Sequence, residues 1–197
     1  MVYTREELAA LYATCQKYDL RLFIDGARLG YGLVSAACDY DLPFLAKHCD
    51  VFYIGGTKVG AMMGEAVVFS GMKAPKYFFT NVKRHGALLA KGRMLGVQFD
   101  TLFTDELYFK ISRHAIAMAT RIRSIFEKHG IAIAYDSPTN QQFVVLSPAL
   151  YEALSPKVAF EIWERKSEHE IICRFVTSWA TKEEELDELD HILQAYA

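Results

Sequence analysis

The first half of the chain alternates helical patterns with short apolar runs that stop abruptly at glycine. A capping-box pattern opens a predicted helix over 5–18, and a short helix is expected over 43–48. Each precedes an expected buried strand, 20–24 ending at Asp25-Gly26 and 51–54 ending at Gly55-Gly56. Another strand is expected at 65–69. Helix, strand, helix, strand, turn and strand in this order predict an α/β sheet.

The second half follows a different pattern, with one long amphipathic helix and several short strands. Apolar residues spaced three or four apart predict a helix over 105–129, which Gly130 ends. The remaining expected elements are strands at 131–135, 142–146 and 171–177, a helix over 158–164, and a last helix, up to residue 194, that a Thr181–Glu184 capping box opens. Helices on a small antiparallel sheet predict an α+β lobe. We therefore expect two domains, 1–100 and 101–197.

The composition excludes several classes of protein. Hydrophobic residues make up 52% of the 197 residues, which is enough for a folded core and excludes wholesale disorder. The formal net charge is −2 and no basic run exceeds two residues, which argues against nucleic acid or a membrane as partner. No apolar stretch approaches the roughly 18 residues of a membrane span. The four cysteines lack metal-binding spacing, so we expect reduced thiols, no metal site and a cytoplasmic protein.

The expected sheet of the first half is thin. Only three strands are predicted there, and such a sheet leaves two edges without partners. We expect that either another chain completes the sheet or the sequence lacks its beginning. Apolar edges that require burial also favour a homo-oligomer, either a dimer or a tetramer.

Asp25 follows the first expected strand, at the end of the sheet where open α/β proteins bind ligands. A carboxylate buried there needs a partner, because an unpaired buried charge is destabilising. Arg28, three residues later, is one candidate, so Asp25 has a structural interpretation as part of an Asp–Arg pair or as a turn cap. In the functional interpretation, Asp25 faces a cationic ring nitrogen of a ligand. The residues alone leave both open.

Lys58 lies in a glycine-rich turn, GGTKVGAMMG, directly after the second expected strand. A lysine at the end of a core strand is poorly placed for solubility alone. Partial burial would favour the neutral amine, which can act as a nucleophile or form a Schiff base. The turn lacks the GxxxxGK[ST] order of a phosphate-binding loop. A lysine in an ordinary surface turn remains the alternative.

Asp25 and Lys58 together suit pyridoxal phosphate (PLP), which needs a lysine for its aldehyde and a carboxylate to keep its pyridine nitrogen protonated. Their segments, FIDGARLGYGL and YIGGTKVGAMMGEAVVF, resemble those of the low-specificity L-threonine aldolases. These enzymes belong to the aromatic amino acid β-eliminating lyase group of fold-type I PLP enzymes. The resemblance continues through RHGALLAKGRMLGVQF and IICRFVTSWATKEEELD. It implies an α/β fold, part of a fold-type I PLP-binding large domain, followed by a small α+β C-terminal domain.

The resemblance also implies a role for each site residue. Lys58 would bind the cofactor aldehyde, Asp25 would face the pyridine nitrogen, and Thr57 would contact the phosphate. Arg28 and Arg174 would hold the carboxylate of an amino-acid substrate, since each offers a bidentate fork. Arg174 lies in the apolar segment IICRFVT, where packing alone does not explain a guanidinium.

The activity implied is PLP-dependent aldol cleavage of threonine, allo-threonine and similar β-hydroxy-α-amino acids to glycine and an aldehyde. Members of the family are longer at the N-terminus, so we expect this sequence to be a C-terminal portion, active in a complete or complemented protein. Two alternatives stay open. One is a β-eliminating lyase of the tryptophanase type, and the other is a non-catalytic truncated remnant.

Overall fold

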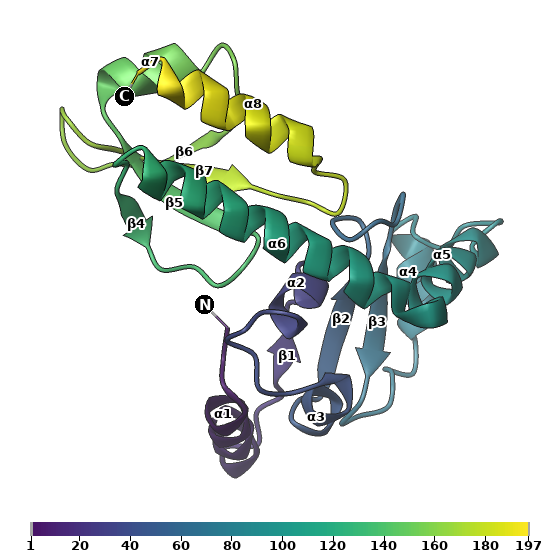
Figure 1. Ribbon diagram of the computed structural model, residues 1–197. Helices are drawn as coiled ribbons and strands as arrows, with labels where there is room; N and C mark the ends of the chain where they lie inside the picture. The colour runs from purple at the N-terminus through teal and green to yellow at the C-terminus, as the bar shows by residue number, and fades with distance from the viewer. Residues whose placement is uncertain (1, 197) are drawn as a thin grey trace. The chain divides into compact units, whose positions relative to one another are not determined.

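The computed structural model describes residues 2–196 and contains two compact units, Val2–Ile111 and Ser112–Ala197 (Figure 1). Each unit has its own sheet and its own apolar core. The domain division expected between residues 100 and 101 stays a prediction.

The first unit is built on a three-stranded sheet. Its strands are β1 (Phe23–Ile24), β2 (Val51–Gly55) and β3 (Glu65–Phe69). Its helices are α1 (Arg5–Lys17), α2 (Leu29–Leu33), α3 (Leu42–Lys47), α4 (Phe78–Arg84) and α5 (Arg93–Phe103), followed by a 3-10 helix, η1 (Thr104–Glu106). The strand order is β1-β2-β3; β1 pairs with β2 in parallel, and β3 pairs with β2 antiparallel. The thin three-stranded sheet is confirmed, but the first strand is shorter than the expected 20–24 and is not buried, since the Phe23 side chain is 57% exposed.

Local contacts explain how this unit is held together. The capping box expected at the start of α1 is present, with Thr4 and Glu7 exchanging hydrogen bonds. The buried carboxylate of Asp50 accepts a hydrogen bond from the Leu22 N–H at 2.8 Å, which joins the segment before β1 to the start of β2. One face of the sheet packs on α1 and α3. The buried side chains of that core are Leu8, Leu45, Cys49 and Phe52.

The second unit is built on an antiparallel sheet, as expected, but the sheet has four strands where three were expected. Its strands, β4 (Ile133–Tyr135), β5 (Gln141–Leu146), β6 (Glu161–Arg165) and β7 (Ile171–Val176), lie in the order β4-β5-β7-β6. Its helices are α6 (Leu107–Lys128), whose residues 107–111 belong to the first unit, α7 (Pro148–Leu154) and α8 (Glu183–Gln194). Figure 1 shows α6 and α8 side by side, and Lys128 on α6 contacts Asp190 on α8 at 2.7 Å. Apolar side chains of both helices and of the sheet form the core, among them Ile122, Phe126 and Leu189 from the helices and Val144, Cys173 and Phe175 from the strands.

Three expectations for the second half are wrong. The helix expected over 158–164 is absent from this part of the chain, and 161–165 form β6 instead, because Glu161 and Ile162 pair with β7. The long helix begins at Leu107 rather than at residue 105, because Asp105 has a left-handed backbone (φ 49°). The capping box at Thr181 is absent, since the Thr181 hydroxyl accepts instead from the Ser178 N–H at 2.9 Å.

Two findings bear on the expectations drawn from composition. Within residues 2–196, no helix is long and apolar enough to cross a membrane. The four cysteines are free thiols, and Cys49 and Cys173 are buried.

Candidate functional site

The ends of β1 and β2 meet at the same edge of the first unit's sheet. Because the two strands are parallel neighbours, the turns that follow them, at Asp25 and at Lys58, leave the sheet side by side. The Gly55 N–H donates to the Gly26 carbonyl at 2.9 Å, which ties the two turns together. A Cβ on Gly26 would lie 1.7 Å from the Tyr53 carbonyl oxygen. Glycine is therefore required where these two strand ends touch.

Asp25 has an exposed carboxylate, of which one oxygen accepts hydrogen bonds from the protein. Its Oδ1 accepts hydrogen bonds from the Ala27 N–H at 3.0 Å and from the Tyr53 hydroxyl. The Tyr53 hydrogen bond is the largest cause that lowers the pKa of Asp25, and the positive charges of Lys58 and Arg28 lower it further. Among residues 2–196, the Oδ2 atom has no hydrogen-bond partner. Asp25 is thus an ionised carboxylate with one oxygen available to a ligand.

Buried tyrosines hold the turn that carries Lys58. Tyr31, on α2, donates its hydroxyl hydrogen bond to the Lys58 carbonyl. The Tyr108 hydroxyl donates to the Gly55 carbonyl at 2.9 Å and accepts from the Gly30 N–H at 3.0 Å. Burial raises the pKa of Tyr108, so its hydroxyl stays a donor. The backbone of the lysine turn is therefore fixed by side chains from distant parts of the sequence.

A carboxylate also holds the same turn from β3. Glu65 accepts a hydrogen bond from the Gly56 N–H, between the end of β2 and Lys58. Gly60 and Gly64 have positive φ angles of 93° and 86°, which let the chain reverse between Lys58 and β3. The glycines of GGTKVGAMMG thus serve the turn's geometry.

Lys58 differs from the expectation of partial burial. Its side chain and that of Thr57 are exposed, because the turn lies beyond the end of β2. Among residues 2–196, the Lys58 amine forms no salt bridge. The amine is accessible to a ligand, and it lacks the burial that was expected of it.

Arg28 does not form the expected ion pair with Asp25. Within the part of the chain that the structure describes, no Asp25–Arg28 salt bridge is present, and the Tyr53 hydroxyl takes the place of the guanidinium. The Arg28 side chain is half-buried, and its Nε has no hydrogen-bond partner among residues 2–196. A buried donor without a partner is costly, so this nitrogen is available to an anion.

Arg174 lies in the second unit, on β7, and has local partners that its sequence context did not reveal. Its Nη2 pairs with Glu161 on β6, its Nη1 donates to Gln141 at 3.1 Å, and its guanidinium lies 5.3 Å from the ring centre of Trp163. These contacts remove the argument that packing cannot explain a guanidinium in this strand. Its Nε is buried and has no partner within residues 2–196, as at Arg28.

Four residues that support this edge were not predicted from the sequence, namely Tyr31, Tyr53, Glu65 and Tyr108. Tyr53 could have been found from register, because Ile24 pairs with Phe52 and the next position of each strand is Asp25 and Tyr53. Tyr108 is 78 residues from its partner Gly30, and no local pattern signals such a contact.

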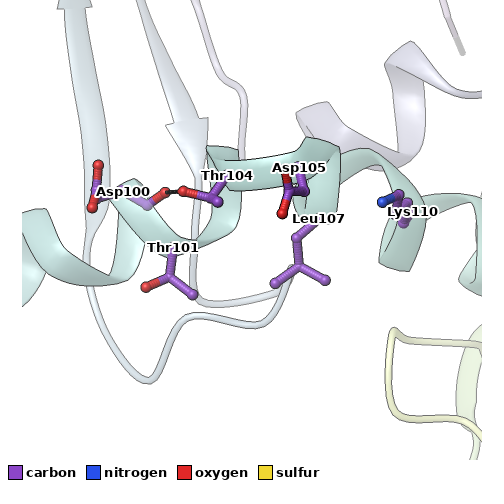
Figure 2. A pocket seen from close by; sticks show the side chains of 6 residues that line it. All are labelled: Asp100, Thr101, Thr104, Asp105, Leu107 and Lys110. Carbon is purple, nitrogen blue, oxygen red and sulfur yellow. Dashed lines mark hydrogen bonds between the residues drawn. The ribbon is translucent and has the colours of Figure 1, made fainter.

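A separate hollow of about 330 Å³ lies where α5 meets α6. Figure 2 shows its lining, Asp100, Thr101, Thr104, Asp105, Leu107 and Lys110. Thr104 donates to the Asp100 carbonyl at 2.8 Å, which closes the last turn of α5. None of the predicted site residues lines this hollow, so the candidate site remains the joined ends of β1 and β2.

The chain is similar in sequence to a known family and to curated proteins. A family model described as beta-eliminating lyase matches residues 1–149. A low specificity L-threonine aldolase from a Pseudomonas species is 30% identical over 189 residues, which are 95% of this chain and 54% of the relative. The chain therefore spans about half the length of the curated relatives it matches.

Solved structures have a fold similar to that of this chain. A structure titled as a threonine aldolase of Leishmania major has a TM-score of 0.94 and 36% identity, and the match covers 98% of this chain and 57% of that one. An aromatic amino acid beta-eliminating lyase/threonine aldolase from Exiguobacterium has a TM-score of 0.69 at 15% identity, which shows the fold alone; that match covers 100% of this chain and 58% of the other. These likenesses confirm the expected fold class, an α/β part of a fold-type I enzyme followed by an α+β part.

Proposed function

The chain belongs to the beta-eliminating lyase family, and from that membership we propose that it carries the lysine and aspartate of a PLP-dependent lyase. The proposed reaction is aldol cleavage of the Cα–Cβ bond of threonine and similar β-hydroxy-α-amino acids, which yields glycine and an aldehyde. Because the chain spans about half the length of its curated relatives, the proposal concerns the activity of the protein to which these residues belong.

One observation carries the proposal. The Asp25 carboxylate and the Lys58 turn leave the sheet from adjoining parallel strands, and the Gly55–Gly26 hydrogen bond of 2.9 Å joins them. The charge of Lys58 lowers the pKa of Asp25, which means that the two groups interact electrostatically. An amine and an ionised carboxylate at one sheet edge are the two groups that PLP requires from its protein.

The donor set at this edge fits PLP. The Lys58 amine is exposed and unpaired within residues 2–196, and Asp25 keeps one oxygen free, so neither group must break an ion pair to bind the cofactor. When bound, PLP supplies a ring that accepts the electron pair left at Cα when the Cα–Cβ bond breaks. Thr57, next to Lys58 in the exposed turn, offers a hydroxyl to the phosphate.

Each candidate site residue has a distinct role in this proposal. Lys58 would hold the cofactor through its Nζ. Asp25, ionised, keeps the proton on the pyridine nitrogen by charge and hydrogen bonding. Arg28 would bind the substrate carboxylate, and its buried Nε has no partner within residues 2–196. The same role for Arg174 is proposed from the resemblance alone, since its guanidinium already pairs with Glu161. A substrate held by its carboxylate can be oriented so that the Cα–Cβ bond is the one that breaks.

Aldol cleavage is favoured over β-elimination by the names of the relatives. The Pseudomonas relative at 30% identity and the Leishmania structure at 36% identity are both called threonine aldolases. The family description names β-elimination, which is the second candidate. The products distinguish the two reactions, because β-elimination releases ammonia and aldol cleavage does not.

The test combines a spectrum with product analysis. The purified chain mixed with PLP should develop a visible absorption band that is absent in Lys58→Ala and retained in Lys17→Ala, a control lysine on α1. Threonine and phenylserine should then yield aldehyde and glycine without ammonia. A colourless mixture would contradict the proposal for this chain, and ammonia would favour the β-eliminating alternative.

We also propose a homo-oligomer in the cytoplasm. Large apolar side chains of the first unit are exposed, including Phe79 at 71%, Met94 at 59% and Val97 at 55%, and such a surface favours self-association. Four free thiols suit a reducing compartment. Sedimentation at micromolar concentration should detect a dimer or tetramer, and a well-behaved monomer would contradict this proposal.

A further inference from the structure

We propose that Tyr53 is the positioning residue for Asp25: its hydroxyl fixes one carboxylate oxygen so that the other faces the pyridine nitrogen of the cofactor. The inference rests on the proposed function, and it deepens the account of the same site. Tyr53 would act through Asp25 and would not touch the substrate.

The sheet itself brings the two side chains together. Ile24 pairs with Phe52 in the parallel register of β1 and β2, so Asp25 and Tyr53 occupy the next position on the two strands. Their side chains therefore lie on the same face, opposite the one on which Phe52 is buried. The Tyr53 ring also packs against Phe23, with a centroid separation of 6.0 Å, which restrains its hydroxyl near the carboxylate.

The hydrogen bonds fix the carboxylate asymmetrically. The Ala27 N–H and the Tyr53 hydroxyl both donate to Oδ1, and Oδ2 has no partner within residues 2–196. Two donors from different directions on one oxygen restrict rotation of the carboxylate. The second oxygen is thereby presented in one orientation, as preorganised binding requires.

The electrostatics of the pair agree with this arrangement. Tyr53 is the largest cause that lowers the pKa of Asp25, and the hydrogen bond to Asp25 raises the pKa of Tyr53 to about 12. The negative charge of Glu65, on β3, raises the pKa of Tyr53 as well, whereas the charges of Lys58 and Arg28 act on Asp25. Tyr53 therefore remains a neutral donor and Asp25 an ionised acceptor across the physiological range.

The first experiment needs no cofactor. Carbon-13 NMR of the labelled aspartate carboxyls should show that Tyr53→Phe raises the pKa of Asp25 toward its ordinary value, whereas Tyr18→Phe, an exposed tyrosine at the end of α1, leaves it unchanged. In the reciprocal variant, Asp25→Asn, the pKa of Tyr53 should fall from about 12 toward the ordinary 10.0. An unchanged Asp25 pKa in Tyr53→Phe would overturn the proposal.

The second experiment adds PLP to the full chain. Tyr53→Phe should weaken PLP binding by roughly tenfold, the usual effect of losing a hydrogen bond to a charged group, and should shift the visible band. Tyr18→Phe should match the unchanged chain in both PLP affinity and the position of the visible band. If Tyr53→Phe binds PLP with the same affinity and spectrum as the unchanged chain, Tyr53 has no positioning role. If the unchanged chain itself shows no band, the proposed function fails, and Tyr53 has no cofactor to position.

Discussion

Replacing Gly26 by alanine tests the claim that the ends of β1 and β2 touch. A Cβ at position 26 would lie 1.7 Å from the Tyr53 carbonyl oxygen, and real contacts of this kind are not shorter than 3.0 Å. The two strand ends must therefore separate by about 1.3 Å (3.0 minus 1.7). That movement strains the Gly55–Gly26 hydrogen bond of 2.9 Å. Overpacking together with one lost hydrogen bond gives a destabilisation of about 2–4 kcal/mol.

Gly32 is the matched control for this change. It lies on α2, only six positions from Gly26, and a Cβ there would meet nothing within 4 Å. Alanine in place of a helical glycine stabilises by about 1 kcal/mol. The two substitutions add the same methyl group, so the expected difference between them is about 3–5 kcal/mol.

Hydrogen exchange is the suitable assay because it resolves the two units. Both tryptophans, Trp163 and Trp179, lie in Ser112–Ala197, so their fluorescence reports on the second unit alone. We expect amides in 20–33 and 50–60 to exchange at least about a hundredfold faster in Gly26→Ala than in Gly32→Ala, since each 1.4 kcal/mol is a factor of ten. Equal exchange in the two variants would refute the inferred contact.

Three further predictions concern single side chains. Tyr108→Phe removes the hydrogen bonds to the Gly55 carbonyl and from the Gly30 N–H, and should destabilise the first unit by about 2–3 kcal/mol, measured by hydrogen exchange. The hydrogen bond from Lys128 is the main reason that the pKa of Asp190 is lowered. The stabilisation that this carboxylate contributes is therefore present above its ordinary pKa and is lost as the pH falls through the lowered pKa. At neutral pH the melting temperature of Asp190→Asn should accordingly be lower than that of the unchanged chain, and at acidic pH the two melting temperatures should converge. A difference in melting temperature that does not change with pH would contradict this. Burial raises the pKa of Cys173 to about 11, so iodoacetamide at mildly alkaline pH should label Cys15 before Cys173, as detected by mass spectrometry. Faster labelling of Cys173 would contradict its burial.

Elements with strong local signals could be predicted from the sequence. The capping box at Thr4 fixes the start of α1, and the run 65–69 coincides with β3. The segment at β6 could not be predicted, because its apolar spacing fits a helix and its strand conformation depends on pairing with β7. Helical propensity is a weak prior that such long-range pairing overrides.

The candidate site divides in the same way. Asp25 and Lys58 could be singled out because strand ends and glycine turns are local features. Tyr108 could not, because its role depends on a contact between distant segments, and the role of Tyr53 follows only once the register of β1 and β2 is known. The exposure of Lys58 was also out of reach, since burial is a property of the whole fold.

Chemical trapping of the cofactor tests the central claim most directly. The chain is mixed with PLP, reduced with borohydride so that any lysine adduct becomes permanent, and digested for mass spectrometry. We predict one dominant adduct, on Lys58, and a marked loss of that adduct in Asp25→Ala. An adduct spread over other exposed lysines, or one on Lys58 that is indifferent to Asp25, would contradict the account that these two residues share one ligand.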